Sequence, residues 1–295
     1  MLSNALQFWK AMGSKEEMFA GNSMLFNVSM PVNTNLISMA SKMRKVWPYG
    51  DLYVLLQPNK KQMKQYTDLF LDFDDTLYDT HGNAVIALQE LFETLQLGQY
   101  FEDPNLFYDE YWKANIDLWT RYSKEEITRD YLIVERFRRP LSFGKGLEPT
   151  KDYCLKASDL FLDYCSSKPG LVEGARELVD YLKRKGYKMH ICSNGFHEVQ
   201  YKKLAACGLR DYFDTIILSE DAGVNKPSPL YFDYALRASG ASRETTVMIG
   251  DNLQTDIIGA RDAGFNTIFF NRWNVDPSGI PDHTVMSLQE IEELL

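Results

Sequence analysis

The chain has few cysteines and no long hydrophobic run. Its four cysteines are Cys154, Cys165, Cys192 and Cys207, and none forms a CxxC pair or another metal-type spacing. This argues against a disulfide framework or a cysteine-bound zinc ion, so we expect reduced thiols and a cytoplasmic protein. No apolar run approaches the roughly 18 residues that a membrane span needs. We therefore expect no membrane segment.

Positive charge is also scarce, with 32 Lys and Arg against 41 Asp and Glu and a net charge of −9. A nucleic-acid polymer calls for a basic face on its partner, so this balance argues against such a polymer. A small phosphorylated ligand needs only local positive charge and stays open. The sequence leaves open whether the protein is a monomer or a homodimer.

Residues 1–62 differ in composition from the rest of the chain. They hold seven of the eleven methionines, and their hydrophobic residues follow no clear period. They lack the basic segment and the clean apolar run of a secretory signal. Met63 precedes the first expected strand and is a plausible start of translation. We expect residues 1–62 to be either an upstream translation or a poorly ordered extension, with a genuine accessory segment as the alternative.

Strands and helices alternate from Tyr66 onward, and the apolar fraction of 45% is sufficient for a sizeable core. The length indicates one to two domains. We expect strands near residues 67–73, 188–193, 215–218, 246–249 and 267–270. We expect helices near residues 173–185, 198–206, 229–238 and 255–263. This alternation predicts an α/β fold, a Rossmann-like doubly wound parallel sheet with helices on both faces.

An insert of about 85 residues lies between the first two strands, which is far more than a crossover needs. Asp103-Pro104 is typical of a helix start, and we expect further helices from Thr128 to Pro140 and from Thr150 to Ser166. The first helix carries a stripe at helical spacing, made of Phe107, Tyr111, Asn115, Leu118 and Tyr122. We predict that residues 82–167 form a helical cap over the sheet, and that residues 63–81 and 168–295 form the core. Such a lid excludes water and selects the substrate.

The most informative segment is Asp72-Phe73-Asp74-Asp75-Thr76, which follows the apolar run Leu69-Phe70-Leu71. Carboxylates at positions i and i+2 of an extended backbone point the same way. Two such charges repel each other unless a cation lies between them. The segment therefore predicts a divalent metal, or a nucleophile with a partnered acid, at the carboxyl end of a strand. The alternative is an acidic turn, because Asp is common in turns.

Three downstream segments favour the first interpretation. Ser193-Asn194-Gly195 ends an apolar strand before a helix and is a natural seat for phosphate. A loop then presents Lys226, and Gly250-Asp251 ends another strand with Asp256 five residues later. Each segment alone is weak, because Ser caps helices, Lys is usually solvated and Gly-Asp forms turns. Together they place side chains at the carboxyl ends of strands, where open parallel sheets bind ligands.

In order and spacing these four segments resemble the haloacid dehalogenase superfamily of hydrolases, over about residues 66–295. The resemblance implies a phosphatase that acts through an aspartyl-phosphate, with Asp72 as nucleophile and Asp74 as general acid and base. It implies Mg²⁺ as cofactor, held by Asp72, Asp251 and the backbone carbonyl of Asp74. It further implies a supporting role for Asp256 and a phosphate site made of Thr76, Ser193, Asn194 and Lys226.

Several alternatives within this resemblance can be weighed. Asp74 argues against a true dehalogenase, because displacement of halide needs no acid and those relatives lack both this residue and the metal. The absence of a membrane run argues against an ion pump with a similar motif. A non-catalytic interaction protein is disfavoured because every catalytic position is filled. Many relatives have Gly where Asp75 stands, and we expect Asp there without a positive φ.

The predicted cap resembles that of the YjjG-type noncanonical pyrimidine nucleotidases. The resemblance rests on Asn115, Leu118-Trp119 and Arg136-Phe137. It implies a nucleoside monophosphate, most plausibly a pyrimidine one, as substrate, with Asn115 and Arg136 as substrate contacts. The alternatives are that these side chains pack the cap's own core, and that the substrate is another small metabolite such as a sugar phosphate or phosphoglycolate.

Overall fold

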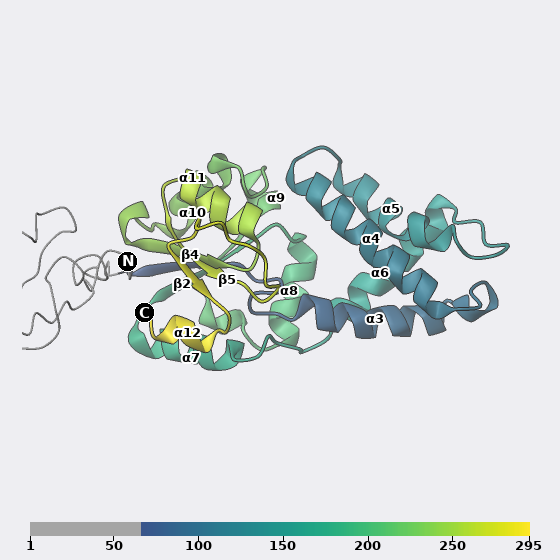
Figure 1. The fold of residues 1–295 in the computed structure, drawn as a ribbon, viewed down its shortest axis with the longest axis horizontal. Helices are drawn as coiled ribbons and strands as arrows, with labels where there is room; N and C mark the ends of the chain where they lie inside the picture. The colour runs from purple at the N-terminus through teal and green to yellow at the C-terminus, as the bar shows by residue number, and fades with distance from the viewer. Residues whose placement is uncertain (1–65) are drawn as a thin grey trace, which may run out of the picture. The chain divides into compact units, whose positions relative to one another are not determined.

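The computed structural model describes residues 66–295, which contain a six-stranded parallel sheet with the order β3-β2-β1-β4-β5-β6 (Figure 1). The strands are β1 Asp68–Leu71, β2 Lys188–Ser193, β3 Thr215–Leu218, β4 Thr246–Gly250, β5 Asn266–Phe270 and β6 His283–Val285. The chain winds outward from β1 in both directions, so the predicted doubly wound α/β fold is confirmed. The expectation for residues 1–62 lies outside the described residues.

Helices cover both faces of the sheet (Figure 1). One face packs against α7 (Ala175–Lys185), α8 (His197–Ala206) and α12 (Gln289–Glu292), and the other against α10 (Pro229–Ser239) and α11 (Gly259–Asp262). Strand β1 is apolar at every position after Asp68 because neighbouring side chains point to opposite faces and both faces are covered. Leu69 and Leu71 belong to the α7 side, and Phe70 to the α10 side.

Helix α7 shows how local sequence fixes an element of this layer. Leu178, Val179 and Leu182 recur at helical spacing and are buried, which gives the helix one apolar face. Gly186 ends the helix with φ 84°, a conformation that favours glycine. The last turn carries three basic residues, which favour the negative end of the helix dipole.

Two elements of the sheet domain differ from the prediction. Strand β6 was not predicted, because it has three residues and only Val285 among them is buried. The helix expected at residues 255–263 is divided into a π-helical turn, η4 (Leu253–Ile258), and the short helix α11. Such wide turns are frequent at functional sites, and this one directly follows the end of β4. The remaining short helix, α9 (Ser219–Ala222), follows β3.

The segment between β1 and β2 contains four long helices, which we call the helical insert and which lie beside the sheet (Figure 1). They are α3 Thr80–Thr94, α4 Pro104–Ser123, α5 Arg129–Leu141 and α6 Lys151–Ser166. The side chains of Asp103, Thr128 and Thr150 cap the last three, as their sequences indicate. Helix α5 continues one residue beyond the expected stop at Pro140, because a proline in the last turn disrupts little of the helix that follows.

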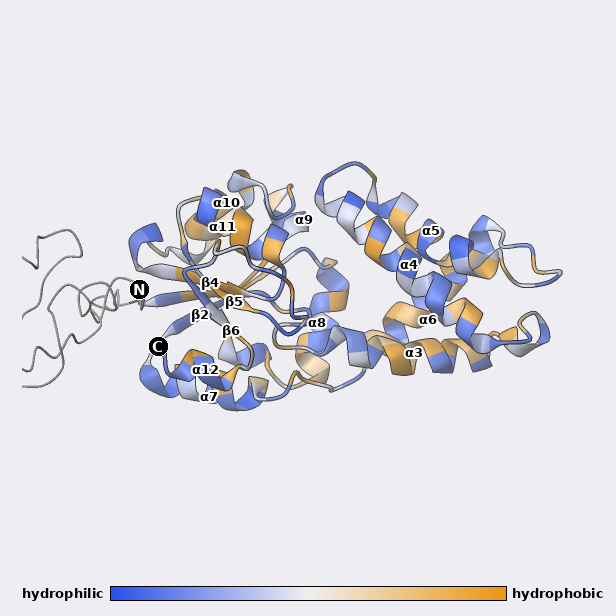
Figure 2. Cartoon of the chain, viewed as in Figure 1, coloured by the Kyte–Doolittle hydropathy of each residue, from blue (hydrophilic) through white to orange (hydrophobic). Residues whose placement is uncertain are grey.

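Helix α3 was not predicted, although Ala84, Ala87, Leu88 and Leu91 recur on one buried face. It packs with α4–α6 around an aromatic core that includes Phe107, Tyr111 and Phe137. In Figure 2 the insert helices carry both hydrophobic and hydrophilic positions, in keeping with one buried and one solvent-facing side. The boundaries predicted for cap and core stay a prediction.

The structure also bears on two of the exclusions drawn from composition. The four cysteines are free and buried, as expected for reduced thiols. No helix in residues 66–295 combines the length and hydrophobicity that a membrane crossing requires.

Candidate active site

The ends of two adjacent strands, β1 and β4, bring acidic groups together. Strand β1 lies between β2 and β4, with Leu71 in register with Ile191 and Ile249. The residues that follow these strand ends therefore meet at one edge of the sheet. Carboxylate oxygens of Asp72, Asp251 and Asp256 lie within 4.8 Å of one another. The roles predicted for Asp72, Asp251 and Asp256 stay a prediction.

Lys226 supplies the positive charge within this cluster. Its Nζ lies 2.8 Å from Oδ1 of Asp72 and 2.7 Å from Oδ1 of Asp256, and the side chain is 2% exposed. Asn194 holds the lysine backbone, since its Oδ1 accepts from the Lys226 amide at 2.8 Å and its Nδ2 donates to the Lys226 carbonyl at 2.9 Å. The loop after β3 is thereby fixed to the end of β2. The predicted phosphate contacts of Asn194 and Lys226 stay a prediction.

Thr76 links the ends of β1 and β4. Its Oγ1 lies 3.2 Å from Oδ2 of Asp72 and 3.3 Å from Oδ1 of Asp251, and it accepts from the Asp251 amide at 3.0 Å. Asp256 has a comparable bracing position, because its Oδ1 accepts from Lys226 and its Oδ2 from the Asn252 amide at 3.1 Å. Both residues are buried. These contacts stabilise the arrangement of Asp72 and Asp251.

The electrostatics of the cluster favour an added cation. Burial raises the pKa of Asp72 to about 7, with Lys226 opposing the rise and the charges of Asp256 and Asp74 adding to it. Burial and the charges of Asp72 and Asp256 raise the pKa of Asp251 well above its ordinary value. Carboxylates that resist ionisation in this way are stabilised by a hard divalent cation, which prefers oxygen ligands. The donor set of Asp72 and Asp251 therefore fits Mg²⁺.

Asp74 lies beside helix α8. Its Oδ1 accepts from Thr80 Oγ1 at 2.5 Å and from Lys203 Nζ, and its Oδ2 accepts from Gln200 Nε2 at 2.5 Å. Burial raises the pKa of Asp74, but the charge and hydrogen bond of Lys203, with those of Thr80 and Gln200, outweigh it and lower the pKa below its usual range. The sequence reading missed Gln200 and Lys203. In the sequence, these two residues are distinguished only by being long polar side chains three positions apart, on the same face of the helix as Val199 and Leu204.

The expectation for Asp75 was wrong, because this residue has φ 61°. Asp tolerates the left-handed region better than most residues, although at some cost. Its side chain makes compensating contacts: Oδ1 accepts from the His81 amide at 2.9 Å and from Arg272 Nη1 at 3.2 Å. Arg272 also donates to the Asp75 carbonyl at 3.1 Å. The position thus has a conformation that glycine adopts freely, and Asp75 is held in it by hydrogen bonds.

Asn115 lies between two aromatic contacts of α4, one with helix α3 and one with the loop after β2. Three residues before it, the Trp112 ring stacks on His81 with centroids 4.4 Å apart. Four residues after it, the Trp119 ring lies 5.4 Å from that of Phe196, which follows the Ser193 loop. The Asn115 side chain is partly exposed and has no hydrogen-bond partner among residues 66–295. Its amide is thus free to bind a ligand.

Arg136 does not have the orientation that a substrate contact requires. It is 2% exposed, donates from Nη2 to Ser158 Oγ at 3.1 Å, and its guanidinium carbon lies 5.1 Å from the Phe161 ring centroid. Burial lowers its pKa. Arg136 lies on the buried face of α5, with Leu132 and Phe137, and its side chain is therefore in the core of the helical insert. The predicted substrate contact is not supported by this geometry.

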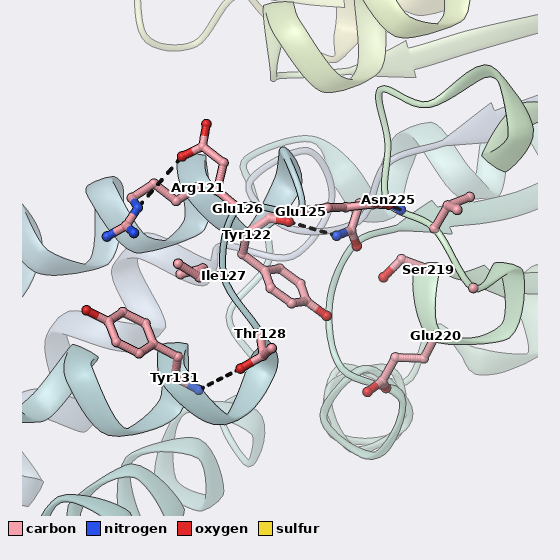
Figure 3. Close-up of a pocket in the computed structure, with 12 residues that line it drawn as sticks. Arg121, Tyr122, Glu125, Glu126, Ile127, Thr128, Tyr131, Ser219, Glu220 and Asn225 are labelled. Carbon is pink, nitrogen blue, oxygen red and sulfur yellow. Dashed lines mark hydrogen bonds and ion pairs between the residues drawn. The ribbon is translucent and has the colours of Figure 1, made fainter.

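A groove of about 640 Å³ lies where the α4–α5 loop faces the loops of the sheet domain (Figure 3). Asn225 Nδ2 donates to the Tyr122 carbonyl at 2.9 Å across it. Arg129 pairs with Glu220 at 2.7 Å and with Glu198. The groove is lined by Asn225 but not by the acidic cluster. These contacts therefore connect the insert to the residue next to Lys226 without forming part of the catalytic centre.

Buried aspartates and a lysine thus gather at the strand ends of a parallel α/β sheet, where such sheets bind ligands. The family model described as haloacid dehalogenase-like hydrolase matches residues 69–264. The chain belongs to this family, and the predicted superfamily is confirmed.

Individual relatives span almost the same region. The pyrimidine 5'-nucleotidase YjjG of Escherichia coli is 34% identical over 232 residues, which cover 77% of this chain and 96% of that protein. The pyrimidine 5'-nucleotidase PynA of Streptococcus pneumoniae is 30% identical, covering 78% of this chain and 95% of that protein. The crystal structure of the HAD-hydrolase YfnB of Bacillus subtilis, bound to magnesium, has a TM-score of 0.70 at 30% identity and covers 79% of this chain and 99% of that one.

Proposed function

We propose that the protein is a Mg²⁺-dependent phosphatase that hydrolyses pyrimidine nucleoside 5'-monophosphates through an aspartyl-phosphate. The observation that carries the proposal is the contact of buried Lys226 with Asp72, beside Asp251. A carboxylate nucleophile, a fixed cation and a second carboxylate for the metal are the parts that phosphoryl transfer needs. The two pyrimidine 5'-nucleotidases among the relatives support the substrate class.

The reaction takes two steps. In the first, an oxygen of Asp72 bonds to phosphorus and the ester P–O bond breaks. Asp74, which must enter this step in its protonated form although Lys203 lowers its pKa, gives that proton to the departing 5' oxygen. In the second, water attacks the aspartyl-phosphate, Asp74 takes the proton of that water, and phosphate leaves with Asp72 regenerated. Such general acid and base help is worth roughly 10²–10⁴-fold. Lys226 offsets the negative charge between nucleophile and phosphate.

Mg²⁺ would be held by Asp72, Asp251 and the Asp74 carbonyl, and when bound it supplies positive charge for the phosphate oxygens. Asp256 keeps Lys226 in place through its 2.7 Å ion pair. Ser193 ends β2, Asn194 follows it, and both line the phosphate side of the site in this proposal. The nucleophile and the phosphate are both anionic, so their approach depends on these cations.

The base lies against helix α4 in this proposal. Among residues 66–295 the Asn115 amide has no hydrogen-bond partner; it lies between Trp112 and Trp119, and aromatic rings near a polar group suit a nucleobase. The second candidate is a phosphatase of another small metabolite, such as a sugar phosphate or phosphoglycolate. The burial of Arg136 favours it, because it removes one of the two residues that pointed to a nucleotide.

A phosphate-release screen tests the proposal. Pyrimidine and purine nucleoside monophosphates, sugar phosphates and phosphoglycolate are compared with Mg²⁺ and again with EDTA. We expect the highest kcat/KM for a pyrimidine monophosphate and near-complete loss in EDTA. A preference for a sugar phosphate would overturn the substrate class alone, whereas full activity in EDTA or halide release from a haloacid would overturn the phosphatase.

A further inference from the structure

Helix α8 holds the Asp74 carboxylate through side-chain contacts that have no role in the mechanism proposed for Asp74. Both oxygens of this carboxylate are engaged, and two of the three donors, Gln200 and Lys203, come from α8. They lie three residues apart, which places them on one face of the helix. Gln200 is fully buried and Lys203 is 5% exposed. Two long polar side chains have therefore been buried to meet one carboxylate.

The surroundings of the two side chains leave them little freedom. Lys203 Nζ lies 5.2 Å from the ring centroid of Tyr78, whose hydroxyl donates to the Cys165 and Lys168 carbonyls at 2.6 and 2.8 Å. A Cβ at Gly195 would lie 1.7 Å from Gln200 Nε2, so glycine at that position leaves room for the amide. Gly195 in the loop after β2 therefore leaves space for the Gln200 side chain, and the Tyr78 ring packs against the Lys203 ammonium.

Gln200 also reaches the predicted phosphate seat. Its Nε2 lies 3.2 Å from Ser193 Oγ and 2.5 Å from Asp74 Oδ2, so one amide group contacts both residues. The leaving oxygen of a substrate is bonded to the same phosphorus whose oxygens Ser193 would hold. The side chain of Gln200 thus sets the spacing between the phosphate seat and the group that must reach the leaving oxygen.

We propose that Gln200 and Lys203 are positioning residues that hold the Asp74 carboxylate beside the phosphate site, aligned with the leaving oxygen of the substrate. The inference rests on the proposed phosphatase activity and deepens it. Alignment matters because a displacement of about 1 Å can reduce the rate by about 10²-fold. A buried ion pair that served stability alone would have no preference for one leaving group over another.

The matched test uses Lys203→Met and Lys202→Met. Methionine keeps the length of the side chain and removes the charge, and Lys202 is the exposed neighbour whose Nζ pairs with Asp163 at 3.1 Å on the surface. Each variant is assayed with Mg²⁺ on an alkyl phosphate, such as a pyrimidine nucleoside monophosphate, and on 4-nitrophenyl phosphate. Formation of the phosphoenzyme is followed in single turnovers, because only that step depends on the leaving group.

We expect Lys203→Met to lower the single-turnover rate on the alkyl phosphate by about 10- to 100-fold. The rate on 4-nitrophenyl phosphate, whose leaving group needs no proton, should fall by less than about threefold, and KM should stay within about twofold. Lys203→Arg should recover part of the loss. Lys202→Met should match the wild type on both substrates.

Gln200→Leu provides a second test in case Lys203→Met melts below the assay temperature. It should show the same dependence on the leaving group together with a raised KM, because it also removes the contact to Ser193. Equal losses on both phosphates, or no loss on either, in variants that keep the wild-type melting temperature would overturn the positioning role.

The failure of this inference is distinguishable from failure of the proposed function. A wild type that rejects nucleotides but hydrolyses another alkyl phosphate overturns the substrate class, and the same comparison then proceeds on that phosphate. A wild type that hydrolyses neither alkyl nor aryl phosphates overturns both proposals.

Discussion

Lys226 Nζ lies 2.8 Å from Oδ1 of Asp72, the proposed nucleophile. The same ammonium lies 2.7 Å from Oδ1 of Asp256 and 2.6 Å from the Cys192 carbonyl. One buried ammonium therefore donates hydrogen bonds to two buried carboxylates and to the backbone carbonyl of Cys192. Buried charges are tolerated when they are paired and hydrogen-bonded in this way.

Removal of this cation should affect both stability and activity. Lys226→Met leaves Asp72 and Asp256 buried without their partner, and breaking a buried pair costs about 3–5 kcal/mol. We expect a lower urea midpoint at pH 8 and a loss of kcat of at least about 10²-fold. Lys188→Met, at an exposed position that begins β2, is the control. An unchanged midpoint in Lys226→Met would show that the ion pairs contribute nothing to folding.

The raised pKa of Asp72 predicts how the stability of the metal-free protein varies with pH. Burial lifts this pKa from 3.8 to about 7, so the folded protein binds this proton more tightly than the unfolded chain. The contribution to folding is present below about pH 4 and is lost as pH rises towards about 7. Asp72→Asn has no such titration. We expect the variant to gain stability relative to the wild type between pH 4 and 7.5.

Urea unfolding in EDTA across that pH range measures the difference directly. Asp251 also has a raised pKa, and the charge of Asp72 contributes to that rise. Asp72→Asn therefore lowers the pKa of Asp251 as well, and the relative gain in stability of the variant includes both titrations. Parallel curves for wild type and Asp72→Asn would show that the Asp72 carboxylate is not destabilised by burial. Activity gives an independent reading, since Asp72→Asn removes the attacking charge and should reduce turnover to near background.

Asp74→Asn tests the acid and base role. General acid–base help is worth roughly 10²–10⁴-fold, so we expect a severe loss on an alkyl phosphate. The loss in the first step should be smallest for an aryl phosphate, whose leaving group departs without a proton. Single-turnover rates on both substrates provide the measurement. Equal losses would mean that Asp74 has a different role.

Asn115→Ala tests whether helix α4 contacts the base or sugar. Loss of one hydrogen bond should cost about 0.5–3 kcal/mol in kcat/KM for a pyrimidine nucleotide. Hydrolysis of 4-nitrophenyl phosphate should change little, and a purine nucleotide should be a poor substrate because its base needs more room.

Arg136→Met is the comparison for this prediction. Arg136 lies in the core of the helical insert, so the change should alter the melting temperature without altering the ratio of nucleotide to aryl activity. An Asn115→Ala variant that loses equally on both substrates would contradict a contact with the nucleotide.

The sequence determined the fold and the edge of the sheet at which the candidate site lies. Apolar runs such as Leu69–Leu71 read as buried parallel strands because both faces of the sheet are covered. Parallel strands end at the same edge, so placing Asp72, Ser193 and Asp251 at the ends of three strands was sufficient to predict that all three lie at that edge. Chain order and hydrophobic period carry this information without any knowledge of packing.

Only the tertiary structure decided which polar groups meet within that edge. Gln200 and Lys203 reach Asp74 across 126 and 129 residues, and Arg136 turned inward although its neighbours resembled a substrate site. A helical period shows which face is apolar, but not which side chain of another element a polar group on that face will meet. That choice depends on how α8 packs against the loop after β1 and how α5 packs against α6, which are relationships between distant segments.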